Sequence, residues 1–159
     1  MGLYLNPGNE EFRNAAIHSK IYVDKTEMIK FTNSQLFGEH KNICVSRPRR
    51  FGKSMAANML VAYYSKGCDS ADIFADYEIS HAGDFRQHLN KYDVIHLDIQ
   101  WCLAPAKGAA GVVSYIEKSV IAELKEKYPN DDLFFIIGED SLNDFDKWYK
   151  PDKILKMCS

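Results

Sequence analysis

The stretch Asn42–Tyr64 constrains the fold of this 159-residue chain more than any other. It begins with a short apolar run, Ile43-Cys44-Val45, continues through a basic loop and then reaches Gly52-Lys53-Ser54. Beyond the loop, apolar residues recur four positions apart, in two series: Met55, Met59 and Tyr63, and Ala56, Leu60 and Tyr64. This spacing places them on one face of a helix. The stretch is therefore expected to form a buried strand, a loop and a helix.

The Gly-Lys-Ser at the start of that helix is typical of a phosphate-binding loop. The first turn of a helix has free N–H groups and a partial positive charge, which attract phosphate. Lys53 adds a charge for the β and γ phosphates, and the Ser54 hydroxyl can ligate Mg²⁺. In the usual pattern G-x-x-x-x-G-K-[ST], Arg47 stands in place of the first glycine. A surface turn beside solvated arginines is the alternative, but the flanking strand and helix favour the phosphate loop.

The loop SRPRRFGKS, residues 46–54, together with YVDKT at Tyr22–Thr26, resembles the bacterial AAA-ATPase-like family. Members of that family carry an RPRRFGK[ST] loop in place of a standard Walker A, so an arginine at the first-glycine position is normal. The resemblance covers residues 1–128 and implies binding of ATP and Mg²⁺. The nucleotide-binding residues that it implies are Arg47, Arg49, Arg50, Phe51, Gly52, Lys53, Ser54 and Met55. The three arginines either neutralise phosphate or pair with acidic residues that shape the loop.

The resemblance also places the VDKT segment next to the nucleotide site. Asp24 and Lys25 are therefore candidates for that site. The alternative is that Asp24 or Thr26 caps the following helix and that Lys25 is a surface lysine.

Two further apolar segments predict strands, Tyr92–Gln100 and Leu133–Ile137, and Val112–Tyr128 predicts an amphipathic helix. A strand, a helical crossover and another buried strand imply a parallel sheet. The expected fold class is therefore α/β, a P-loop NTPase-like three-layer sandwich with a mostly parallel, incomplete sheet. We expect one domain, with a lead-in at 1–41, a nucleotide-binding core at 42–140 and a divergent tail at 141–159.

The acidic residues expected beside the phosphates are altered. ATPases of this kind end a strand in Asp-Glu, where the Asp holds the metal and the Glu polarises water. Here Gly138 replaces the Asp, which leaves Glu139 and Asp140 as the candidate catalytic residues. Asp98, near the end of the second predicted strand, is a candidate Mg²⁺ ligand together with Ser54, with a structural role as the alternative.

The altered acids and the missing later elements of the family predict a truncated copy. We expect it to bind ATP with weak or absent hydrolysis, and whether it is an ATPase at all stays open. A different class of function is a non-enzymatic interaction module, in which an exposed sheet edge pairs with another protein or a second copy.

Composition excludes several other classes. A net charge of −2 gives no general attraction to nucleic acid or anionic membrane, so polyanion binding through the arginines is the least favoured function. No apolar segment approaches the roughly 20 residues that span a bilayer, and we expect a cytoplasmic protein. The 4 cysteines form no C-x-x-C pair, which argues against a zinc site or a redox motif.

Overall fold

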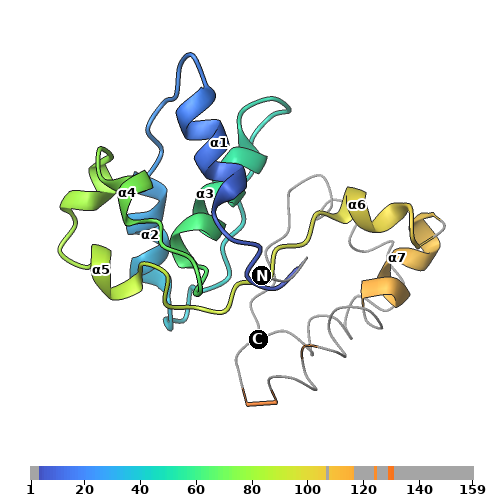
Figure 1. Cartoon of the computed structure of the whole chain (residues 1–159). Helices are drawn as coiled ribbons and strands as arrows, with labels where there is room; N and C mark the ends of the chain where they lie inside the picture. The colour runs from blue at the N-terminus through green and yellow to red at the C-terminus, as the bar shows by residue number, and fades with distance from the viewer. Residues whose placement is uncertain (1–3, 107, 117–123, 125–128, 131–159) are drawn as a thin grey trace. The chain divides into compact units, whose positions relative to one another are not determined.

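The computed structural model describes residues 4–106, 108–116, 124 and 129–130. The chain divides into two compact units, Met1–His96 and Leu97–Ser159. The first unit contains α1 (Glu10–His18), α2 (Glu27–Gln35), α3 (Lys53–Tyr64), α4 (Ala71–Phe74), the 3-10 helix η1 (Glu78–His81) and α5 (Phe85–His88) (Figure 1). The second unit contains α6 (Ile99–Leu103) and α7 (Ala109–Ile116).

The expected α/β sandwich with a mostly parallel sheet is wrong for the described residues, because none of them forms a β-strand. Two isolated bridges are present instead: Leu5 pairs antiparallel with Ile95, and Ser65 pairs parallel with Tyr92. Around the first bridge, the Asn6 N–H donates to the Val94 carbonyl at 2.8 Å. The architecture of the first unit is a cluster of helices.

The run Ile43-Cys44-Val45 shows why the strand prediction failed. The run is irregular, Cys44 is exposed, and its two neighbours are half-buried. A strand requires a neighbouring backbone to satisfy its N–H and C=O groups, and apolar residues alone do not supply one. Residues 91–98 are irregular apart from single bridge residues, and α6 begins at Ile99. The predicted strand Leu133–Ile137 lies outside the described residues.

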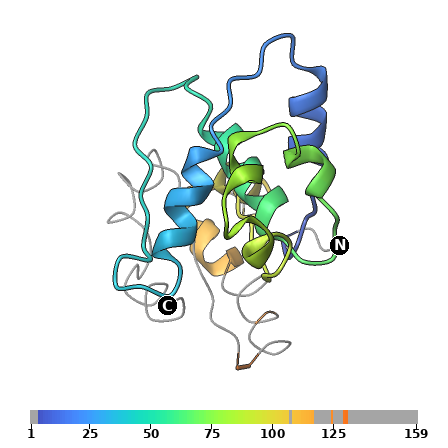
Figure 2. The ribbon, with the colours of Figure 1, turned by 90° about the vertical axis from the view of Figure 1, so that its left-hand side faces the viewer.

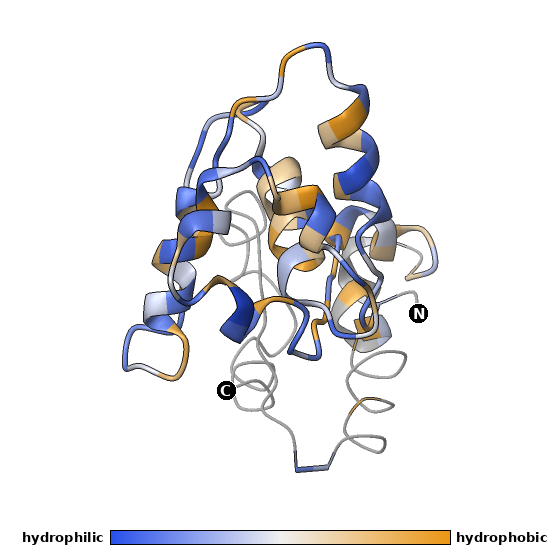
Figure 3. Cartoon of the chain, turned by 60° about the vertical axis from the view of Figure 1, so that its left-hand side comes forward, coloured by the Kyte–Doolittle hydropathy of each residue, from blue (hydrophilic) through white to orange (hydrophobic). Residues whose placement is uncertain are grey.

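Helix α3 lies at the centre of the first unit's core. Figures 1 and 2 both show it between α1 and α2. The predicted helix is present, but Met59, Leu60, Val61, Ala62 and Tyr63 are all buried, so burial surrounds its second half and is not confined to one face. The buried residues packed into this core are Phe12, Ile29, Met59, Leu60, Ala62, Tyr63, Phe74, Ile79, Phe85 and Leu89. In Figure 3 the helices carry both hydrophobic and hydrophilic positions, as expected when one side covers a core.

Hydrogen bonds tie the end of α3 to its neighbours. The buried Tyr63 hydroxyl donates to the Phe85 carbonyl at 2.8 Å and accepts from Asn33 Nδ2 at 3.2 Å. The Tyr64 hydroxyl donates to Asn33 Oδ1 at 2.7 Å, so one asparagine of α2 contacts both tyrosines. Burial raises the pKa of Tyr63 to about 12, and it also raises the pKa of Tyr64.

The second unit has a small core of its own, formed by the buried residues Cys102, Val112 and Ile116. Helix α7 begins at Ala109, before the start of the helix predicted over Val112–Tyr128, and overlaps that prediction at residues 112–116. The rest of that prediction lies outside the described residues, except for Leu124, which is helical and buried. In the described part of the chain, no helix has the length and apolar character needed to cross a membrane.

Candidate functional site

The basic loop leads directly into α3, as the sequence predicted. Gly52 caps the helix with φ 80°, a left-handed conformation that favours glycine. Arg50 also has a positive φ, 68°, which is uncommon for a residue with a side chain. The Phe51 N–H lies 3.4 Å from the Pro48 carbonyl, and the Ala56 N–H donates to the Gly52 carbonyl at 2.9 Å. The loop therefore turns sharply before the helix begins at Lys53.

Lys53 folds back across this loop. Its Nζ donates to the Arg47 carbonyl at 2.7 Å, which joins the lysine to the position where a standard phosphate loop has its first glycine. No side chain of the described residues caps the N-terminus of α3, and its first turn contains no acidic residue. Ser54 is exposed in the same turn. The positive end of α3 and the Lys53 ammonium thus occupy one short segment, an arrangement that suits an anion.

The three arginines of the loop all have exposed side chains. The sequence left two roles open for them, neutralising phosphate or pairing with acidic residues. Among the described residues, no acid pairs with Arg49 or Arg50. Phe51 is 62% exposed, so it does not anchor the loop in the core. Pairing of these two arginines with an acid has no support in the described part of the chain.

The VDKT segment reaches the same loop through one residue. Lys25 Nζ lies 3.2 Å from the Phe51 carbonyl and donates to it. A Cβ added to Gly52 would lie 3.0 Å from the same Nζ. The sequence left Lys25 undecided between a site residue and a surface lysine, because no local spacing relates it to a loop 26 positions away.

Asp24 has a structural role at the start of α2. Its carboxylate accepts hydrogen bonds from the Thr26 N–H at 2.8 Å and from the Glu78 N–H at 2.9 Å. Partial burial opposes ionisation of Asp24, but these two N–H groups outweigh it and hold the pKa of Asp24 below its usual value. Asp24 thus orders the turn before α2, but no side-chain hydrogen bond caps this helix in the described structure, so the capping alternative is not observed.

Of the predicted acidic partners, the structure describes Asp98 alone. Asp98 belongs to the second unit, where its carboxylate accepts from the Gln100 N–H at 2.8 Å and caps α6. Glu139 and Asp140 lie outside the described residues. Within the part of the chain that is described, no three His, Cys, Asp or Glu side chains gather into a metal-binding cluster.

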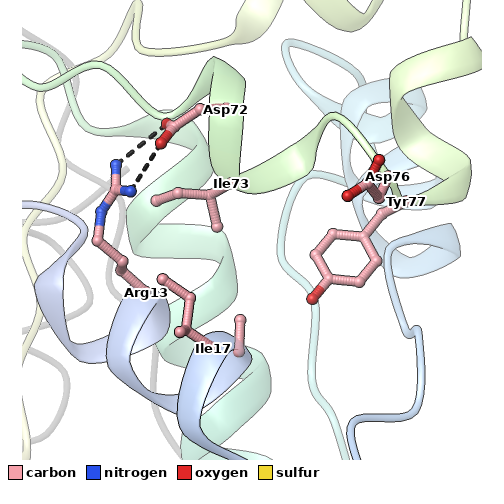
Figure 4. A pocket seen from close by; sticks show the side chains of 7 residues that line it. Arg13, Ile17, Asp72, Ile73, Asp76 and Tyr77 are labelled. Atoms are coloured by element: carbon pink, nitrogen blue, oxygen red, sulfur yellow. Dashed lines mark hydrogen bonds and ion pairs between the residues drawn. The ribbon is translucent and has the colours of Figure 1, made fainter.

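A pocket of about 260 Å³ lies elsewhere in the first unit, between α1 and α4 (Figure 4). Arg13 holds Asp72 beside it through two hydrogen bonds, of 2.7 Å and 3.0 Å, and this lowers the pKa of Asp72. The lining residues are Arg13, Ala16, Ile17, Asp72, Ile73, Asp76 and Tyr77. None of the site residues predicted from the sequence lines this pocket.

Comparison with known proteins gives one match over most of the chain. The sequence profile of a family described as "Predicted AAA-ATPase" matches residues 7–144. No solved structure matches the chain.

Short stretches also match curated proteins. A probable nicotinate-nucleotide adenylyltransferase of Citrifermentans bemidjiense is 43% identical over 53 residues, which is 33% of this chain and 24% of that protein. The nicotinate-nucleotide adenylyltransferase of Bacillus subtilis is 51% identical over 37 residues, 23% of this chain and 20% of that protein. The chain therefore spans only a quarter or less of the length of these two relatives.

Proposed function

The chain belongs to the AAA-ATPase-like family, and on this basis we propose that it binds ATP with Mg²⁺ at the loop formed by residues 47–55. One observation supports the proposal most directly: Lys53 lies across the loop on the Arg47 carbonyl, at the N-terminus of α3, where the N-cap residue is a glycine without a side chain. An anion at this place would meet an ammonium group and the positive end of a helix together.

The roles of the loop residues follow from their chemistry. Lys53 exchanges the neutral Arg47 carbonyl for oxygens of the β and γ phosphates, which are stronger acceptors because they are charged. The Ser54 hydroxyl ligates Mg²⁺, and backbone N–H groups from Arg50 to Met55 donate to phosphate oxygens. The exposed Arg47, Arg49 and Arg50 add positive charge near the same oxygens.

Hydrolysis is proposed to be weak or absent. Phosphoryl transfer depends on positioned charge, and Gly138 stands where the family has its metal-associated Asp. Glu139 and Asp140 remain the proposed catalytic residues, and Asp98 a proposed metal ligand besides Ser54. The Asp98 carboxylate already caps α6, so metal binding would compete with that hydrogen bond.

Two other functions receive less support. The adenylyltransferase matches cover 53 and 37 residues, which is less than a typical domain, so we do not propose that activity for this chain. The interaction module was expected to use a sheet edge, and the described residues contain no sheet.

Thermal unfolding with and without Mg²⁺-ATP tests the proposal. A ligand that binds only the folded state stabilises it by about 2.7 kcal/mol at a hundredfold excess over Kd. We expect ATP to raise the unfolding temperature of the parent protein and of Lys20→Ala, an exposed lysine outside the loop. The shift should vanish in Lys53→Ala. Absence of any shift in a cooperatively folded parent would refute ATP binding.

A further inference from the structure

We propose that Lys25 is a second phosphate-binding cation of this site, an inference that rests on the proposed function. The site would then hold triphosphate between two ammonium groups from different segments. Lys53 comes from the start of α3, and Lys25 comes from the turn before α2. The ligand class is a nucleoside polyphosphate, recognised through its phosphates.

The backbone on both sides of Lys25 is held in place. Before it, Asp24 accepts from the Glu78 N–H at 2.9 Å. After it, the fully buried Thr26 accepts from the Ile79 N–H at 3.1 Å through Oγ1. Both acceptors are bound to η1, whose Ile79 is also buried in the core. Lys25 therefore extends from a backbone with little freedom to move, which lowers the entropic cost of placing its ammonium group.

From this base the side chain of Lys25 reaches the loop and stops at its last turn. Its Nζ donates to the Phe51 carbonyl at 3.2 Å, and a Cβ on Gly52 would approach it to 3.0 Å. Glycine at position 52 thus leaves the ammonium group room beside the helix start. A lysine ammonium has three N–H donors, and among the described residues Phe51 supplies the hydrogen-bond acceptor for one of them.

The two lysines make the same kind of contact. Lys53 donates to one main-chain carbonyl of the loop and Lys25 to another, those of Arg47 and Phe51. Both contacts are at exposed positions, where a bound anion can reach the ammonium groups. Hydrogen bonds between charged groups are stronger than those to neutral carbonyls, so phosphate oxygens would replace or share these acceptors.

The test measures binding of Mg²⁺-ATP, and of tripolyphosphate as a probe without a base, by isothermal titration calorimetry at two salt concentrations. Lys25→Met removes the charge with a side chain of similar length, and Lys20→Met is the matched control. We expect about tenfold weaker binding of both probes by Lys25→Met, equivalent to about 1.4 kcal/mol, and parent affinity for Lys20→Met. Lys25→Arg keeps the charge and should recover most of the affinity.

The salt series separates a phosphate contact from a purely structural role. Screening weakens charge interactions, so affinity for ATP should fall less steeply with salt in Lys25→Met than in the parent. An unchanged salt dependence, unchanged affinity in Lys25→Met, or an equal loss in Lys20→Met would each overturn the role of Lys25. The proposed function would still hold in those cases if the parent protein binds ATP and Lys53→Met does not. A parent that binds neither probe overturns both proposals. Thermal unfolding of each variant without ligand confirms that it is folded.

Discussion

At the scale of single residues, Tyr63 shows how the core accommodates a polar group. Its ring is fully buried, and its hydroxyl bonds the Phe85 carbonyl and Asn33. Tyr63→Phe keeps the ring but removes the donor and the acceptor. We expect the free energy of unfolding to fall by about 1–3 kcal/mol, measured by urea denaturation.

Tyr77→Phe is the matched control for this change. Tyr77 is half-buried, and its hydroxyl has no hydrogen-bond partner among the described residues. Removal of the Tyr77 hydroxyl should change the free energy of unfolding by no more than about 0.5 kcal/mol. Equal effects of the two substitutions would show that the Tyr63 hydrogen bonds do not stabilise the fold.

Tyr63 also makes the free energy of unfolding depend on pH in the alkaline range. Burial raises the pKa of Tyr63 to about 12, from 10.0 in an exposed tyrosine. Above pH 10 the unfolded chain therefore holds fewer protons than the folded one, and stability is lost as the pH rises from about 10 to about 12. Burial raises the pKa of Tyr22 and Tyr64 in the same direction. Tyr63→Phe should make the free energy of unfolding fall less steeply with rising pH, but it should not abolish this fall.

At the scale of elements, α1 places one fully buried large side chain in the core. Phe12 is fully buried, and its ring stacks on Phe74 with centroids 5.3 Å apart and meets Tyr22 edge-on at 5.8 Å. Phe12→Ala should lower the free energy of unfolding by about 3–5 kcal/mol, measured by chemical denaturation.

Ile17→Ala tests whether that loss is specific to the buried face of α1. Ile17 lies on the same helix and is 63% exposed. Its truncation should cost no more than about 0.5 kcal/mol. Because alanine has a higher helix propensity than isoleucine, a comparable loss from Ile17→Ala would show that the effect is not specific to the buried contacts of Phe12.

At the scale of the whole molecule, the two cores are separate in sequence. Every residue of the larger core lies between Phe12 and Leu89, whereas the smaller core consists of Cys102, Val112 and Ile116. A fragment of residues 1–96 should therefore fold alone and unfold cooperatively, close to the temperature of the first transition of the full chain. Circular dichroism during heating measures the cooperativity of unfolding and the unfolding temperature, for the fragment and for the full chain. A fragment without a cooperative transition would show that the first unit depends on the second.

The sequence allowed the central helix α3 to be predicted but misled on the sheet and on α6, which overlaps a predicted strand. The spacing of Met59 and Tyr63 is local information, and the helix that buries them formed as predicted. A strand depends on a distant partner, and nothing in the run 43–45 indicates whether one exists. The start of the helix after Gly52 was predictable in the same way. The approach of Lys25 to Phe51 was not, because it depends on how two segments meet in space.

The closeness of Lys25 to Gly52 restricts how this chain can evolve. Any residue with a Cβ at position 52 would strain a backbone with φ 80° and would push against an ammonium group only 3.0 Å away. Such a residue would require the Lys25 ammonium group to shift by a few tenths of an ångström beside the Phe51 carbonyl. A substitution at position 52 is thus tolerated more easily once position 25 carries a shorter side chain. Among natural variants of this sequence, positions 25 and 52 are expected to change together.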